Sequence, residues 1–142
     1  MKITDVAPPT DQDFSVLRDG LNGFNALHTE ELLREKVSSF VKDDNQKTLG
    51  GILGEIKWGW LYVEGLWVDE SVRASGVGSQ LLNQLERYAM SKGIYNFRLE
   101  TTSFQALPFY QKQGYVIFGE LPDMPPSHTS FFLKKQIKLM GK

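Results

Sequence analysis

One change of hydrophobic period, near the middle of the chain, constrains the fold more than any other feature. Residues 61–68 are nearly continuously apolar, as expected for a strand buried on both faces. The run stops at Asp69 and Glu70, and a glycine-containing turn leads into a stretch whose apolar residues repeat at helical spacing. A buried strand followed at once by a helix predicts a βα unit, and a strand expected at residues 96–102 would complete a βαβ crossover.

Shorter patterns predict the other elements. Alternating residues predict strands at residues 2–6, 37–41, 48–56, 115–120 and 129–133. Helical spacing predicts helices at residues 12–26, 77–89 and 105–113, with a further helical turn at 29–33. Three glycines at positions 50, 51 and 54 indicate a bulge or a close approach of two backbones. The order predicts a mixed α/β fold, in which a largely antiparallel N-terminal sheet precedes the βαβ unit.

Length and composition narrow the class of protein. A chain of 142 residues predicts a single domain, residues 1–142, and 41% hydrophobic residues exclude a largely disordered chain. A net charge of -1 argues against nucleic-acid binding through bulk positive charge. The absence of cysteine excludes disulfides, thiolate zinc sites and cysteine nucleophiles, and two histidines are too few for a histidine-rich metal cluster. With no membrane-length apolar run and no signal-peptide core, we expect a cytoplasmic protein without metal, nucleic acid or membrane partners.

The turn between residues 68 and 77 carries the clearest ligand-binding signal. Gly76 and Gly78 allow the backbone to approach a ligand without an intervening Cβ. The first amides of the following helix have no intrahelical partner, and the helix dipole favours an anion beside them. The segment therefore predicts a phosphate or pyrophosphate site, with a purely structural tight turn as the alternative. It matches neither the Gly-Lys-Ser/Thr ending of a Walker A sequence nor the three-glycine Rossmann spacing.

These residues resemble a known family. The pattern Arg73-x-x-Gly76-x-Gly78 after an apolar strand resembles the Arg/Gln-x-x-Gly-x-Gly/Ala pyrophosphate loop of the GNAT family of N-acetyltransferases. Residues 105–115, QALPFYQKQGY, resemble the A-x-x-F-Y-x-K-x-G-F block of that family. The order of elements agrees over nearly the whole chain. The resemblance implies a mostly antiparallel sheet of about six or seven strands, flanked by about four helices, with splayed central parallel strands.

A narrower resemblance is to a bacterial subgroup of small stand-alone acetyltransferases. It rests on WGWLYV at residues 58–63, LWV at 66–68, TSFQA at 102–106 and PSH at 126–128. Members commonly have a glycine just before the histidine, where this chain has Ser127. The subgroup implies no particular acceptor.

The family resemblance implies acetyl-CoA as the acyl donor. Its pyrophosphate would lie on the loop and helix start formed by Arg73, Ala74, Ser75, Gly76, Val77 and Gly78. Its pantetheine arm would pair, like an extra strand, with the main chain of Leu66, Trp67 and Val68. Gln105 stands where the family often has an asparagine that bonds the pantetheine or a backbone carbonyl, and its longer side chain departs from that pattern.

Two residues are predicted to carry the chemistry. Family members with a tyrosine at the position of Tyr110 use its phenol to protonate the leaving thiolate, and a packed aromatic is the alternative role. Glu64 is predicted as the general base that takes a proton from the acceptor amine. Alternative bases are Glu55, Glu100, His28 and His128, and Trp58 and Trp60 are candidates for lining the acceptor pocket.

The predicted function is N-acetyl transfer from acetyl-CoA to a primary amine, by direct attack in a ternary complex. The acceptor would be a small molecule or a protein amino group, and a homodimer is compatible with the family. One alternative is a non-catalytic acyl-CoA-binding sensor, which would bind the donor without turnover. A second, a small nucleotide-binding regulator, is disfavoured by the motif spacing.

Overall fold

The computed structural model describes residues 1–139 and divides the chain into two compact units, Met1–Leu32 and Leu33–Lys142. The first unit holds helix α1 (Asp11–Ala26), which confirms the helix predicted from the apolar spacing. The Thr10 hydroxyl accepts a hydrogen bond from the Asp13 amide at 3.0 Å and caps its first turn. The single domain predicted over residues 1–142 stays a prediction, and its last three residues lie outside those described.

Two elements predicted near the N-terminus are wrong. Residues 2–6 form no strand, because a strand needs a neighbour for its backbone hydrogen bonds and residues 1–32 contain no second strand. Residues 29–33 form no helical turn. Thr29, expected to begin that turn, closes the end of α1: its hydroxyl donates to the Asn25 carbonyl at 3.2 Å, and its amide donates there at 3.1 Å.

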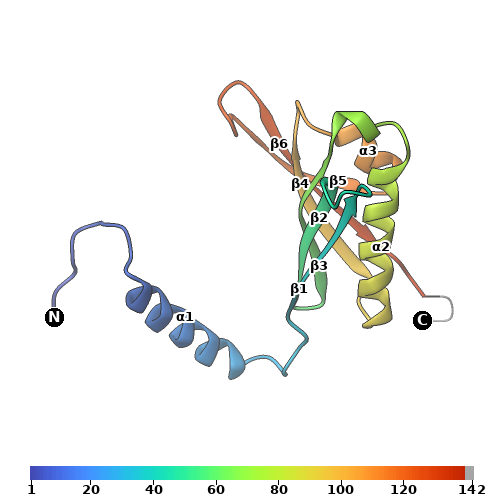
Figure 1. Ribbon diagram of the computed structural model, residues 1–142. Helices are drawn as coiled ribbons and strands as arrows, with labels where there is room; N and C mark the ends of the chain where they lie inside the picture. The colour runs from blue at the N-terminus through green and yellow to red at the C-terminus, as the bar shows by residue number, and fades with distance from the viewer. Residues whose placement is uncertain (140–142) are drawn as a thin grey trace. The chain divides into compact units, whose positions relative to one another are not determined.

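The second unit is a six-stranded sheet in the order β1-β2-β3-β4-β6-β5, with α2 and α3 on one face (Figure 1). All neighbouring strands are antiparallel except β3 and β4, which are parallel and joined through α2. The elements are β1 (Glu35–Lys42), β2 (Thr48–Lys57), β3 (Trp60–Val68), the 3-10 turn η1 (Glu70–Val72), α2 (Val77–Ser91), β4 (Asn96–Thr102), α3 (Leu107–Lys112), β5 (Val116–Pro122) and β6 (Thr129–Gln136). This confirms the predicted mixed, mostly antiparallel fold. The described residues hold three α-helices, fewer than the predicted four, because residues 29–33 are not helical.

The core lies between α2 and the sheet. One face of α2 is buried, as its helical spacing predicts, through Leu81, Leu82, Leu85 and Ala89. The sheet supplies the facing side chains from its central strands: Ile52, Ile56, Leu61, Val63, Phe97, Leu99 and Leu133. This packing fixes the start of α2 against the end of β3.

A bulge in β3 is the main irregularity of the sheet. Leu53 pairs with Gly65, but the next residue, Gly54, pairs with Val63, so Glu64 is an extra residue opposite β2. The glycines of β2 predict a bulge or a close approach, and β2 does have an extra residue, Leu49 beside Gly50, opposite β1. Between β2 and β3, the inserted residue belongs to β3. Gly54 instead provides close approach, because a Cβ there would lie 2.8 Å from the Tyr62 carbonyl oxygen.

The bulge changes which side chains of β3 face α2. Leu61 and Val63 face the core before the bulge, and Leu66 and Val68 pack against it afterwards. Pairing between β3 and β4 stops at Val63 and Leu99, immediately before the inserted residue. The two parallel strands separate from there, which confirms the predicted splay. Within residues 1–139, the main chain of residues 64–68 has no strand partner on the β4 side.

Two observations bear on membranes and metals. No helix within residues 1–139 is both long and apolar enough to cross a membrane. Among the same residues there is no group of three or more histidine or acidic side chains placed to hold a metal ion. The cytoplasmic location stays a prediction.

Sequence patterns did not predict a buried charged cluster that joins α2 to β6. Glu86, only 3% exposed, receives a hydrogen bond from the Tyr115 hydroxyl at 2.7 Å and forms an ion pair with Lys135 at 3.1 Å. Burial, followed by the negative charge of Glu86, raises the pKa of the Tyr115 phenol. The phenol therefore remains a hydrogen-bond donor to the carboxylate.

Replacing Glu86 should destabilise the fold, because Lys135 and Tyr115 would lose their common partner. We expect Glu86→Ala to lower the free energy of unfolding by about 3 kcal/mol and the melting temperature by roughly 10 °C. Calorimetry measures the shift. Arg87→Ala, at the neighbouring exposed position of α2, serves as the control, and an equal shift in both variants would contradict the role of the cluster.

Candidate active site

A cavity of about 540 Å³ lies between the end of β3, the start of α2 and α3. We call it the α2 cavity. Its walls include most of the predicted donor-binding residues: Leu66, Trp67, Val68, Arg73, Ala74, Gly76, Val77, Gly78 and Tyr110. They also include four residues that sequence reasoning missed: Val72, Ser79, Ala106 and Phe109. Each of the four is next in sequence to a predicted residue, so this proximity was the available signal.

The start of α2 is built to receive an anion. Its N-cap is Gly76, at φ 85° and ψ 4°, and neither a capping side chain nor an acidic residue occupies the first turn. The first amides and the positive end of the helix dipole are therefore not compensated within the helix. A Cβ at Gly76 would meet no atom within 4 Å, so the space beside the turn is open. This arrangement suits a phosphate group.

The loop before α2 is held in place by its own polar side chains. The Arg73 Nε donates to the Val68 carbonyl at 3.0 Å, which ties the loop to the last residue of β3. The Ser75 hydroxyl donates to the Val72 carbonyl, and Ser75 does not line the cavity. Ala74 adopts a φ of 64°, a left-handed conformation unusual for a residue with a Cβ.

Tyr110 is the titratable group buried in this cavity. It is 7% exposed, and its ring meets those of Phe109 and Tyr115 edge-on, with centroids 5.2 and 6.0 Å away. Burial raises the pKa of the Tyr110 phenol above its usual value of 10.0. The phenol thus stays protonated at neutral pH and is able to donate a proton inside the cavity.

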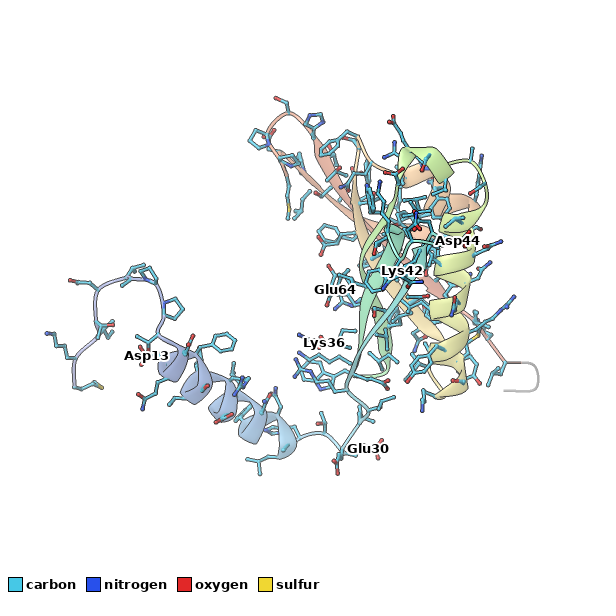
Figure 2. All side chains as sticks on the ribbon, in the orientation of Figure 1. Asp13, Glu30, Lys36, Lys42, Asp44 and Glu64 are labelled. Atoms are coloured by element: carbon cyan, nitrogen blue, oxygen red, sulfur yellow. The ribbon has the colours of Figure 1, made fainter. Side chains whose placement is uncertain are left out.

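A second cavity, of about 340 Å³, contains Glu64 and Gln105, which do not line the first. We call it the acidic cavity. It is lined by Tyr62, Glu64, Glu100, Thr101, Thr102, Gln105, Met124, Pro125 and Ser130. Figure 2 shows Glu64 on the side of the sheet away from α2. The two cavities therefore border the separation of β3 and β4 from opposite faces of the sheet.

The polar groups of the acidic cavity are partly engaged with one another. The Gln105 Oε1 accepts a hydrogen bond from the Thr102 amide at 3.0 Å, so this oxygen is used within the protein. Thr102 Oγ1 is buried and has no hydrogen-bond partner among the described residues. The pKa of the Tyr62 phenol is raised, mainly by burial and further by the charges of Glu100 and Glu64. Arg98, which lies 4.2 Å from the centroid of the Tyr62 ring, acts in the opposite direction.

The remaining candidate bases lie elsewhere, with one exception. His128 packs edge-on against Phe104, with ring centroids 4.8 Å apart. Glu55 forms an ion pair with Arg34 at 3.5 Å, and His28 belongs to the first unit. Glu100 alone among the alternatives shares a cavity with Glu64.

The two candidate tryptophans line a third cavity, of about 550 Å³. Its other walls are Lys57, Arg98, Phe118 and Lys134. The Lys57 Nζ lies 4.7 Å from the ring centroid of Trp58, so one face of the Trp58 ring is already covered by a cation.

Comparison with known proteins identifies the family. The Acetyltransferase (GNAT) family model matches residues 9–115. The chain belongs to this family. Blasticidin-S acetyltransferase from Streptomyces morookaense is 36% identical to this GNAT protein over 104 residues, which are 72% of the chain and 76% of the relative. The relatives are acetyltransferases, and the chain is an acyltransferase of the same family.

Solved structures give the same fold. The crystal structure of an acetyltransferase from Bacillus cereus is 35% identical, with a TM-score of 0.85 over 94% of this GNAT chain and 98% of that one. An aminoglycoside 6'-N-acetyltransferase complexed with coenzyme A shares the fold at 19% identity, with a TM-score of 0.67 over 94% and 84% of the two chains.

Placing a carboxylate at the start of α2 should prevent anion binding there. We expect Gly78→Glu to raise the Kd for acetyl-CoA more than about a hundredfold, because an unpaired carboxylate would repel the phosphates. A Cβ at this position makes only ordinary contacts, the shortest 3.7 Å to the Phe109 ring, so the variant should remain folded. Calorimetric titration measures Kd, and Asn83→Glu, at an exposed position further along α2, adds the same charge as the control. Binding equal to that of the parent would contradict the assignment of the loop.

Proposed function

We propose that this GNAT protein transfers the acetyl group of acetyl-CoA to a primary amine by direct attack in a ternary complex. The observation that carries the proposal is the α2 cavity, where an unpaired strand edge, an uncapped helix start and a buried, protonated phenol meet. Relatives named for acetylating blasticidin S and aminoglycosides support an amine acceptor. The coenzyme A bound to the relative of the same fold supports the donor. The activity is assigned to one domain, residues 1–142.

The donor would bind along β3 and the start of α2. The amides from Arg73 to Gly78 would hold the pyrophosphate, with Gly76 providing the open backbone. The main chain of residues 66–68 pairs with β2 on one side, and its open side toward β4 would hydrogen-bond the amides of the pantetheine arm in the manner of an added strand. A net charge of -1 is compatible with this anionic substrate, because main-chain amides carry the recognition.

The acceptor would enter from the acidic cavity and reach the thioester through the separation of β3 and β4. Glu64 would take a proton from the ammonium group, so that the amine nitrogen can form a bond to the acetyl carbon. As the carbon–sulfur bond breaks, Tyr110 would give its proton to the departing thiolate. The nitrogen would lose its second proton to solvent, and Tyr110 would regain a proton from solvent. The chain has no cysteine to carry an acetyl group, which favours direct transfer.

Removing the Tyr110 hydroxyl should slow turnover without weakening donor binding. We expect Tyr110→Phe to lower kcat about tenfold or more and to change the Kd for acetyl-CoA less than twofold. Because burial raises the pKa of Tyr110, the parent should show no loss of rate from its ionisation below about pH 10. Steady-state kinetics and binding measure both quantities. Tyr88→Phe, which removes a hydroxyl from an exposed tyrosine, is the control, and unchanged kcat in Tyr110→Phe would reduce Tyr110 to a packing role.

Replacing the proposed base should produce a defect that depends on pH. We expect Glu64→Gln to lower kcat about a hundredfold near neutral pH, where the acceptor amine is mostly protonated. The deficit should shrink as the pH rises, because more of the amine is already neutral. Kinetics across the pH range test this. A deficit that is constant with pH would argue against Glu64 as the general base. Binding of acetyl-CoA with no turnover on any amine would favour the alternative function, a non-catalytic acyl-CoA-binding sensor.

A further inference from the structure

The acidic cavity holds two carboxylates at equivalent positions on neighbouring strands. Tyr62 pairs with Arg98 across β3 and β4, so Glu64 and Glu100 each stand two residues further along, where the strands begin to separate. Both residues are exposed and both line the cavity. Tyr62 lines the same cavity, and both carboxylates raise the pKa of its phenol.

Neither carboxylate of this pair is held by an ion pair within the described part of the chain. Neither Glu64 nor Glu100 takes part in an ion pair among residues 1–139. The walls of the acidic cavity include no lysine or arginine. The neighbouring cation, Arg98, lies over the Tyr62 ring and lines the third cavity instead. The cavity therefore presents two negative charges to whatever enters it.

One carboxylate suffices for the proposed reaction. Once Glu64 has taken a proton from the acceptor, the reacting amine is neutral and has lost its attraction to the cavity. In that scheme Glu100 takes no part in the proton transfer, so its negative charge is not used by the reacting amine. An acceptor with one amine would leave that charge without a partner, whereas an acceptor with a second cationic group would remain held.

We propose that the acceptor carries a second cationic group, which Glu100 binds while the reacting amine faces Glu64. This inference rests on the proposed function. The other walls suit the part of the molecule between the two cations. Met124 and Pro125 offer apolar contacts for methylene groups, and the Tyr62 ring offers an aromatic edge to the cavity. Glu100 is thus a specificity-determining residue, and a small aliphatic diamine is the simplest acceptor with the required chemistry.

Three amines of similar length test the proposal on the full chain with acetyl-CoA. They are 1,4-diaminobutane, 1-aminobutane and 4-aminobutanoate, which differ in carrying a cation, no charge or an anion at the far end. We expect the parent enzyme to prefer the diamine to the monoamine about fivefold in kcat/KM, and the amino acid to be the poorest acceptor. Added salt should reduce the preference, because it screens the interaction with Glu100.

Two variants separate binding of the second cation from proton transfer. Glu100→Gln should raise KM for 1,4-diaminobutane about fivefold, with kcat and the monoamine kinetics changed less than twofold. Glu64→Gln should lower kcat for both amines. Glu120→Gln, which removes a charge from an exposed position of β5 outside the acidic cavity, is the control and should change none of these values.

The outcomes distinguish this inference from the proposed function. Acetylation of the amines without a preference for the diamine would overturn the inference and leave the proposed function standing. Equal effects of Glu100→Gln on the diamine and the monoamine would also overturn it. Failure to acetylate any of the three amines or blasticidin S, despite measured binding of acetyl-CoA, would count against the proposed function itself.

Discussion

The inserted residue Glu64 is the constraint on which the site depends. A regular β3 would continue its pairing with β4 beyond Val63 and would turn Leu66 and Val68 toward the opposite face of the sheet. The bulge instead keeps these side chains packed against the core and frees the main chain on the β4 side. Core packing and an open binding edge therefore coexist in one strand. The same inserted residue places a carboxylate at the mouth of the opening.

The opening between the strands divides the chemistry between two faces. On the face covered by α2, the helix start, the open turn at Gly76 and the buried Tyr110 create surroundings that suit an anionic thioester donor. On the other face, Glu64 and Glu100 create surroundings that suit a cationic acceptor. The electrostatic contrast is local, because the chain as a whole is nearly neutral. The proposed reaction in a ternary complex would give each substrate its own face of the sheet.

Periodic segments were predictable where one local rule dominates. The helix from Val77 and the strand Asn96–Thr102 were predicted because their apolar residues repeat at one period over a full element. The alternation at residues 2–6 predicted a strand wrongly, since a strand forms only where a neighbouring strand accepts and donates its backbone hydrogen bonds. The ion pair of Glu86 and Lys135 was not predictable, because the two residues are 49 positions apart and neither carries a local signal.

By itself, the sequence determined the order of elements from β1 to β6, the family, and the loop that suits a phosphate, because each follows from residues close together along the chain. Only the tertiary structure decided that the bulge at Glu64 belongs to β3 and that Glu64 faces away from the cavity of Tyr110. It alone also decided that the Gln105 amide oxygen accepts a hydrogen bond from the Thr102 amide. Only the fold set Glu100 beside Glu64, through the parallel pairing of strands separated by a whole helix. Such relations depend on register, and register is fixed when side chains pack, not by any short stretch of sequence.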